Sequence, residues 1–130
     1  MTKAILLSIH PEWAQKIYSG EKTVEYRKSI PKYNHDIMVY MYETSPVRKV
    51  TGFFKMISHF RMDVVEHLVC DKLVARGCLS IQELRHYQND SKDVVGWVVA
   101  GFEKFEQPKQ LADFGLKRAP QSWQYVKVKE

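Results

Sequence analysis

The sequence predicts an α+β fold built on a closed or nearly closed β-barrel of about six strands. The strand-like segments are short and rich in β-branched and aromatic residues, and an early helix and a later helical stretch interrupt them. Gly52, Gly96 and Gly101 stand where a sheet must bend in order to close. No repeat, linker or low-complexity tract divides the 130 residues, so we expect one domain over residues 1–130.

The first half of the chain is expected to hold strands and one short helix. A short apolar run indicates a buried strand over residues 3–9. Pro11 suits the first position of a helix and Gly20 suits its C-terminal cap, so a short helix is expected between them. Further strands of this half are expected from Gly20 to about residue 30, at 37–42 and at 50–60, with a loop at 33–36.

The second half begins with helical character. Asp63 and Glu66 have the spacing of a capping box, and apolar residues at helical intervals, Leu68 among them, lead to Gly77. Ser80 repeats the capping pattern with a glutamate three residues later and starts a shorter helix. We expect this pair of helices to be an insertion or lid between two strands. The helical pair is expected at 63–88, further strands at 94–105 and 122–128, and a turn at 107–109.

Composition favours a protein with a polyanionic partner. The formal charge of +5 and the isoelectric point near 9.2 are mildly basic, which suits RNA, DNA or a nucleotide. No apolar run approaches the ~20 residues of a membrane-spanning helix, and the first residues do not have the pattern of a signal peptide. We therefore expect a cytoplasmic protein without a membrane partner.

Neither the cysteines nor the histidines indicate a metal or other cofactor. Cys70 and Cys78 are expected to be reduced, buried thiols, because no further pair with zinc-ligand spacing surrounds them. The histidines are scattered along the chain without a ligand pattern. They are His10, His35, His59, His67 and His86.

The stretch from Gly20 to Arg27, GEKTVEYR, is the strongest candidate for a site. On a strand, Glu25 and Arg27 share one face about 7 Å apart, while Val24 takes the other face. Two interpretations follow. Lys22 and Arg27 hold a phosphate while Glu25 accepts from a base or a ribose hydroxyl. Alternatively, Glu25 and Arg27 form an exposed salt bridge worth at most about 1 kcal/mol.

Aromatic residues and one histidine add to the candidates. Tyr42 and Trp97 are candidates for stacking on a base, although most aromatic residues of a small domain lie in its core. His10 precedes the helix N-terminus, which favours the neutral imidazole, and it is either a base or a plain turn residue. No nucleophile elbow or phosphate loop is present, so catalysis would be acid–base work by Lys22, Glu25 or His10.

Three ordered motifs resemble the ASCH domain family. The segment SIHPE at residues 8–12 and the Gly-x-Lys-x-x-Glu-x-Arg stretch at 20–27 are similar to that family's helix and signature. YETSP at 42–46, followed by Gly52, resembles its tyrosine and Ser-Pro turn, and APQSWQY at 119–125 resembles the ending of one branch. The resemblance covers nearly the whole chain and is least distinctive over residues 62–91.

The resemblance implies a PUA-like β-barrel with a cleft that binds RNA or a nucleotide, and a role in transcription, translation or RNA metabolism. Some members are ribonucleases, and others are amidohydrolases that deacylate N4-acetylcytidine. Here Glu25 stands where that amidohydrolase branch has a threonine, and Gly77 stands about where it has a helical glutamate. The cleft residues implied are Lys22, Glu25 and Arg27, with Tyr42 and Ser45 at the rim and Ser122 and Tyr125 as weaker candidates.

Several functions therefore remain open at the level of the sequence. The first is a module that binds RNA or a nucleotide through Lys22, Glu25 and Arg27, with Tyr42 or Trp97 stacking on a base. The alternatives are a metal-independent ribonuclease, less favourably an N4-acetylcytidine amidohydrolase, and an interaction domain in which the motif is structural.

Overall fold

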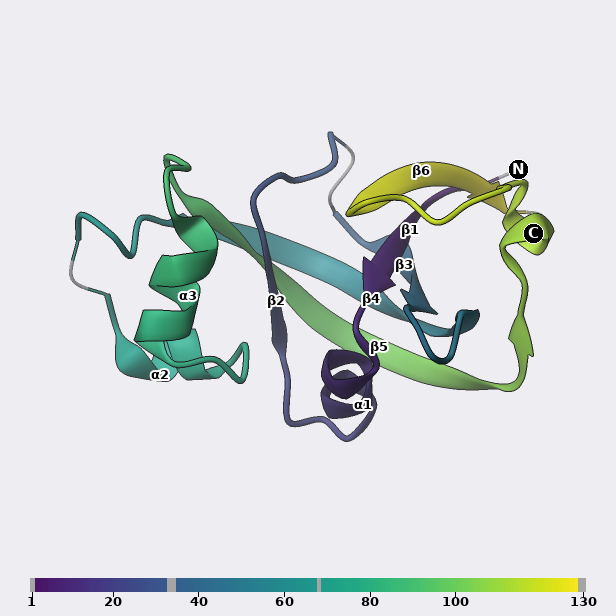
Figure 1. Ribbon diagram of the computed structural model, residues 1–130, viewed down its shortest axis with the longest axis horizontal. Helices are drawn as coiled ribbons and strands as arrows, with labels where there is room; N and C mark the ends of the chain where they lie inside the picture. Colours follow the sequence, from purple (N-terminus) through teal and green to yellow (C-terminus); the bar gives the residue numbers. More distant parts are fainter. Residues whose placement is uncertain (1, 33–34, 68, 129–130) are drawn as a thin grey trace.

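One curved sheet dominates the fold, which we describe from a computed structural model for residues 2–32, 35–67 and 69–128. Its strands follow the order β2-β5-β4-β3-β1-β6 (Figure 1). The strands are β1 (Thr2–Ile9), β2 (Val24–Arg27), β3 (Ile37–Glu43), β4 (Lys49–Met62), β5 (Val94–Lys109) and β6 (Trp123–Val128). The helices are α1 (Pro11–Tyr18), α2 (Asp71–Ala75), α3 (Ile81–Gln88) and the 3-10 helix η1 (Leu111–Phe114).

The sheet is open between its two edge strands, β2 and β6. β1 pairs with β3 in parallel and with β6 in antiparallel orientation, and the other pairs are antiparallel. The α+β class is confirmed, but the barrel expected from the sequence does not close. β2 ends at Arg27 rather than near residue 30, and side chains bridge the open seam in place of a ladder. The indole N–H of Trp123 donates to Ser29 Oγ at 2.9 Å, and Arg27 Nη1 donates to Ser122 Oγ at 3.2 Å.

β4 and β5 are the two long strands, and they cross the length of the molecule in Figure 1. The turn expected at 107–109 is wrong, because β5 continues through Pro108 and Lys109 pairs with Val50. β2 pairs only with Val95 to Val98 of β5, so Pro108 lies where β5 lacks a second partner strand. A proline is tolerated at such an edge because its missing N–H leaves no ladder bond unmade.

The helix expected to begin at Asp63 is also wrong, since α2 covers only Asp71–Ala75. Asp63 does accept from the backbone N–H groups of Val65 and Glu66, at 3.1 and 3.0 Å, but these close a turn rather than a helix. Gln88 explains the difference, because its amide group donates to Asp63 Oδ1 at 2.9 Å and accepts from the Val64 N–H at 2.9 Å. Leu68 of the predicted helix lies outside the described residues.

α3 matches its prediction, since Ser80 and Glu83 form the expected reciprocal capping box. Cys70 and Cys78 are free thiols, as expected, but neither is buried as expected: Cys70 is exposed and Cys78 is half-buried. Tyr33 and Asn34 of the predicted loop lie outside the described residues. None of the helices in the described part of the chain is long and apolar enough to cross a membrane.

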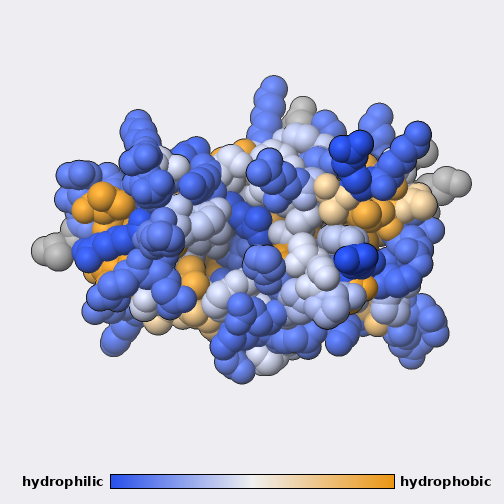
Figure 2. Space-filling model, viewed as in Figure 1, coloured by the Kyte–Doolittle hydropathy of each residue, from blue (hydrophilic) through white to orange (hydrophobic). Residues whose placement is uncertain are grey.

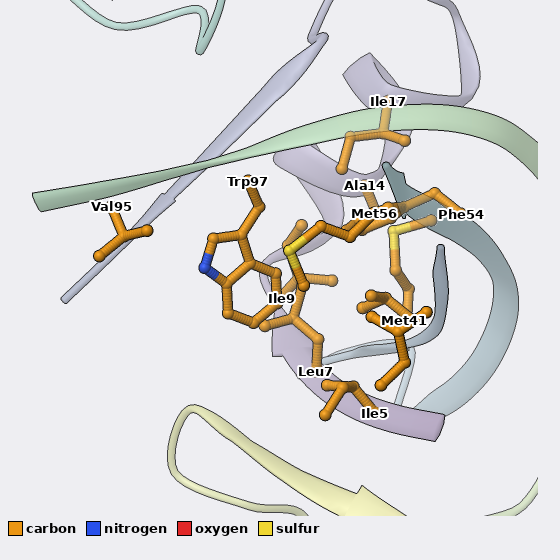
Figure 3. Packing of buried hydrophobic residues seen from close by; sticks show 12 residues of the cluster. Ile5, Leu7, Ile9, Ala14, Ile17, Met41, Phe54, Met56, Val95 and Trp97 are labelled. Atoms are coloured by element: carbon orange, nitrogen blue, oxygen red, sulfur yellow. The ribbon is translucent and has the colours of Figure 1, made fainter. Parts of the chain in front are cut away.

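The apolar core divides into three clusters. The main cluster fills the concave side of the sheet beneath α1, where Trp97, Phe54 and Ile17 pack together (Figure 3). A second cluster joins Val24 and Tyr26 of β2 to α2 and α3, and the third lies against η1. The remaining surface is largely hydrophilic, with apolar side chains visible towards both ends of the molecule (Figure 2).

Gly52 lies at a bulge in β4, where the backbone of β5 approaches closely. The ladder shifts register between Val50 and Gly52, and a Cβ at this position would overlap the carbonyl oxygen of Glu103. Gly52→Ala is therefore expected to lower the free energy of unfolding by about 3 kcal/mol. Gly115→Ala is the matched control, because its Cβ meets no atom and only its left-handed backbone, with φ of 77°, costs about 1 kcal/mol. Equal urea midpoints for the two variants would contradict the crowding at Gly52.

Candidate functional site

A cavity of about 690 Å³ lies between the sheet and the helical stretch. β2 forms its floor, and β2 runs between α1 and α3 in Figure 1. The residues that line it are Ser8, His10, Trp13, Lys22, Glu25, Tyr26, Arg27, Thr44, Leu79, Gln82, Glu83, His86, Tyr87 and Gln121. The helical stretch, residues 71–88 with α2 and α3, thus supplies one wall of the cavity. The sequence did not specify where these helices lie.

Lys22 reaches the floor of this cavity from the turn before β2. Gly20 follows the C-cap residue of α1 with a φ of 84°, and the backbone N–H of Lys22 then donates to Lys16 O at 2.9 Å. The Lys22 ammonium donates to the carbonyl oxygen of Gly77 at 2.6 Å and lies 3.2 Å from Glu25 Oε1. Only 2% of Lys22 is exposed, so its charge depends on these partners.

Glu25 lies between Lys22 and Arg27 and is itself buried. Arg27 Nε and Nη2 approach Glu25 Oε2 at 2.8 and 2.7 Å. Arg27 Nη2 also donates to the carbonyl oxygen of Ser8 at 2.9 Å. Of the two interpretations of the sequence, the one with a Glu25–Arg27 pair is right in the pairing and wrong in its exposure, since the pair is largely buried. The network of Lys22, Glu25 and Arg27 uses most of the donors of both cations.

The protonation state of Glu25 follows from this network. Burial by itself raises the pKa of Glu25, but the charges of Arg27 and Lys22 and the hydrogen bonds from both outweigh it, so the pKa lies below its ordinary value. The carboxylate is thus ionised at neutral pH. A carboxylate with a lowered pKa and engaged oxygens is a weak general base.

The other face of β2 fixes the helical stretch in place. Tyr26 packs in the second cluster with Val24, as the strand alternation predicts, and its hydroxyl donates to Leu73 O at 2.8 Å. Burial raises the pKa of Tyr26 to about 12. A Cβ on Gly77 would lie 2.6 Å from the Tyr26 ring, so the absence of a side chain there lets the Gly77 carbonyl reach Lys22.

The walls of the cavity carry groups that are less engaged. His10 is exposed, and its Nδ1 lies 3.1 Å from Thr44 Oγ1. The Trp13 ring lies 5.2 Å from the Lys22 ammonium, and the Tyr87 ring lies 5.3 Å from the Lys28 ammonium. Sequence reasoning assigned no role to Tyr87, because a polar residue late in an amphipathic helix ordinarily faces solvent.

The other residues expected at the site lie outside the cavity lining. Trp97 is fully buried in the main core and donates its indole N–H to Ser29 O, so its ring has no free face for a base. Tyr42 is half-buried in the third cluster, and Ser45 is exposed in the turn beside Thr44. Two further candidates lie near the seam: Ser122 accepts from Arg27, and Tyr125 packs against the main core.

The described residues contain no group of three or more His, Cys, Asp or Glu side chains placed to hold a metal ion. The fold and site thus define an α+β protein with a cavity between its sheet and a helical wall, and with a buried ion-pair network on the floor of that cavity. The ASCH domain model matches residues 7–108, and the chain belongs to the ASCH domain family.

Two kinds of protein are similar in sequence to this chain. The ASCH domain-containing ribonuclease of Zymomonas mobilis is 28% identical over 98% of this chain and 87% of its own length. The crystal structure of ASCH from Zymomonas mobilis superposes with a TM-score of 0.78 at 25% identity, covering 95% of this chain and 87% of that one. The ATP synthase subunit alpha of Ureaplasma parvum is 29% identical over 96% of this chain, but the match spans only 15% of that protein.

The buried network predicts a specific loss of stability in acid. Because its pKa is lowered by folding, the Glu25 carboxylate stabilises the protein fully above the ordinary carboxyl pKa of about 4.3, and this stabilisation is lost as the pH falls through the lower, folded value. Glu25→Gln should be less stable near neutrality and should lose less further stability on acidification. Thermal unfolding followed between about pH 7 and pH 3 tests this, and parallel curves would contradict it.

The same network predicts unequal roles for two lysines. Lys22→Met removes one partner from a buried pair and should cost about 3–5 kcal/mol of unfolding free energy. Lys16→Met is the control, because Lys16 and Glu21 form an exposed pair at 3.9 Å whose loss should cost less than about 1 kcal/mol. Urea titration of both variants measures the difference, and a Lys22→Met protein as stable as the control would show that the network does not support the fold.

Proposed function

We propose that the chain binds single-stranded RNA and that the cavity receives one of its nucleotides. The observation that carries this proposal is the cavity itself, with the network of Lys22, Glu25 and Arg27 on its floor and the rings of Trp13 and Tyr87 in its walls. Its volume of about 690 Å³ falls within the range of sites for small ligands and cofactors.

Charge and kinship support the same proposal. Single-stranded nucleic acids are held by basic surfaces that contact the backbone and by aromatic side chains that stack on unpaired bases. The chain has a formal charge of +5, and a relative that it matches over 87% of that protein's length is named a ribonuclease, a class of protein that must hold RNA.

Fluorescence anisotropy with a labelled single-stranded RNA tests the proposal. The affinity should fall on the logarithmic scale by about 0.7 for each logarithmic unit of salt and each phosphate contacted. Tyr87→Ala should weaken binding, whereas Phe102→Ala, another exposed aromatic substitution outside the cavity, should not. Absence of RNA binding at low salt, or binding that does not change with salt, would overturn the proposal.

A second candidate function is metal-independent cleavage of RNA, favoured by the ribonuclease of Zymomonas mobilis. Cleavage requires a base that activates the ribose 2′-hydroxyl and an acid that protonates the leaving oxygen. Glu25 is poorly suited to be that base, because its pKa is lowered and its oxygens are engaged. His10 and His86 both line the cavity, and imidazoles are suited to both roles.

The ribonuclease candidate is tested by incubating RNA with the protein in EDTA. Cleavage should persist and should fall by about 100-fold or more in His10→Gln. His67→Gln is the matched control, because His67 is exposed and lies outside the cavity lining. No cleavage by the unaltered protein would exclude this function, and equal cleavage by His10→Gln would exclude His10 as the base or acid.

A further inference from the structure

We propose that the cavity is a nucleobase site: it takes the unstacked base of one ribonucleotide against Trp13 and Tyr87, while the phosphates of that strand remain outside at Lys28. This inference rests on the proposed function and makes it specific, because it assigns the cavity to a neutral aromatic ring rather than to a phosphate. It also differs from the interpretation of the sequence in which Lys22 and Arg27 hold the phosphate.

The charge of the lining carries the first step. The ionised side chains on the cavity wall are Lys22 and Arg27, which are positive, and Glu25 and Glu83, which are negative, so the formal charges cancel. The Glu83 carboxylate already accepts the backbone N–H of Ser80 in the capping box of α3. A buried phosphate needs uncompensated positive charge, and this lining does not supply it.

The hydrogen bonds of the two cations carry the second step. Lys22 donates to Gly77 O, and Arg27 donates to Glu25, to Ser8 O and to Ser122 Oγ. A phosphate entering the cavity would have to displace these bonds and leave Glu25 buried without its partners. A neutral base can lie against the network without breaking it.

The two rings carry the third step, because they lie beside the same network on different helices. Trp13 of α1 is half-buried, with its ring under the Lys22 ammonium. Tyr87 of α3 is 37% exposed, and burial together with Glu25 raises the pKa of its phenol while Arg27 opposes the change. α1 and α3 lie on either side of β2 (Figure 1), so the rings line the cavity from two elements. Such rings are platforms for the face of a base.

Other lining side chains suit the edge of a base. Gln82, Gln121 and Thr44 each carry both a hydrogen-bond donor and an acceptor, as does the imidazole of His86 in its neutral form. The edges of unpaired bases likewise present mixed donors and acceptors, which is how proteins read single-stranded RNA.

Lys28 supplies the place for the phosphate. It is exposed directly after β2, its ammonium lies over the Tyr87 ring at 5.3 Å, and no ion pair of Lys28 is present among the described residues. A strand whose base lies against Tyr87 therefore meets, at the same ring, a cation that forms no ion pair among the described residues. The base and the phosphate are thus recognised by different residues, and each can be tested separately.

The first test uses free nucleosides and ribose 5-phosphate as probes. Nucleosides should bind with an affinity that does not change with salt and should quench tryptophan fluorescence in the unaltered protein but not in Trp13→Phe. Ribose 5-phosphate should not compete with them. Tyr87→Ala should lower nucleoside affinity about tenfold or more, and Tyr87→Phe should keep it, because stacking needs the ring and not the hydroxyl. Phe102→Ala should have no effect.

The second test separates this inference from the proposed function. Lys28→Gln should lower the affinity for single-stranded RNA and reduce its salt dependence, while nucleoside affinity stays unchanged. Ribose 5-phosphate binding as tightly as a nucleoside would overturn the inference. So would RNA binding that Tyr87→Ala leaves unchanged, although the proposed function would then stand. Absence of RNA binding in the unaltered protein, with nucleosides still bound, would overturn the proposed function and retain the nucleobase site.

Discussion

The buried ion-pair network of Lys22, Glu25 and Arg27 joins parts of the molecule that no ladder connects. Arg27 reaches Ser8 of β1 and Ser122 before β6, and so links the two edges of the open sheet. Lys22 donates to Gly77 and so attaches the helical stretch to β2. Charges removed from water are costly unless each has a partner. Lys22 and Glu25 are buried and Arg27 is half-buried, and each of the three has at least two partners. The seam of the sheet, the position of the helices and the floor of the cavity all depend on this arrangement.

This dual role limits what the network does for function. A side chain that holds the fold together through several bonds has little freedom to bind or protonate a ligand. The lowered pKa of Glu25 and the engaged donors of Arg27 both reflect this. The less engaged groups lie on the walls of the cavity, where His10 is exposed and Tyr87 is partly exposed. Under the proposed function, substitution on the floor should therefore change stability and binding together, whereas substitution on the walls should change binding with little effect on stability.

The sequence predicts those parts of the structure that depend on residues close together in the chain. Pro11 and Gly20 frame α1, and Ser80 caps α3, because each acts within one turn of backbone. The absence of the helix predicted to begin at Asp63 could not be foreseen, because Gln88 binds Asp63 across 25 positions of the sequence. The sequence also predicts Glu25 as a residue of the site, but it does not predict that the Glu25 side chain is buried. That burial arises from α3 and from main-core residues far away along the chain, which no local pattern encodes.

The register of β2 against β5 explains why the floor of the cavity is rigid. Glu25 lies directly opposite Trp97, and Arg27 lies opposite Val95, and directly opposed residues of an antiparallel pair share one face of the sheet. Trp97 and Val95 belong to the main core, so the ion pairs lie against closely packed apolar side chains. An apolar setting strengthens the attraction between the charges and excludes the water that would loosen them. A ligand therefore meets a floor whose dipoles are already oriented, and binding needs no reorganisation of the charges. Trp97 thus contributes to the site as the packed support of Glu25, not as the stacking platform that its aromatic ring predicted.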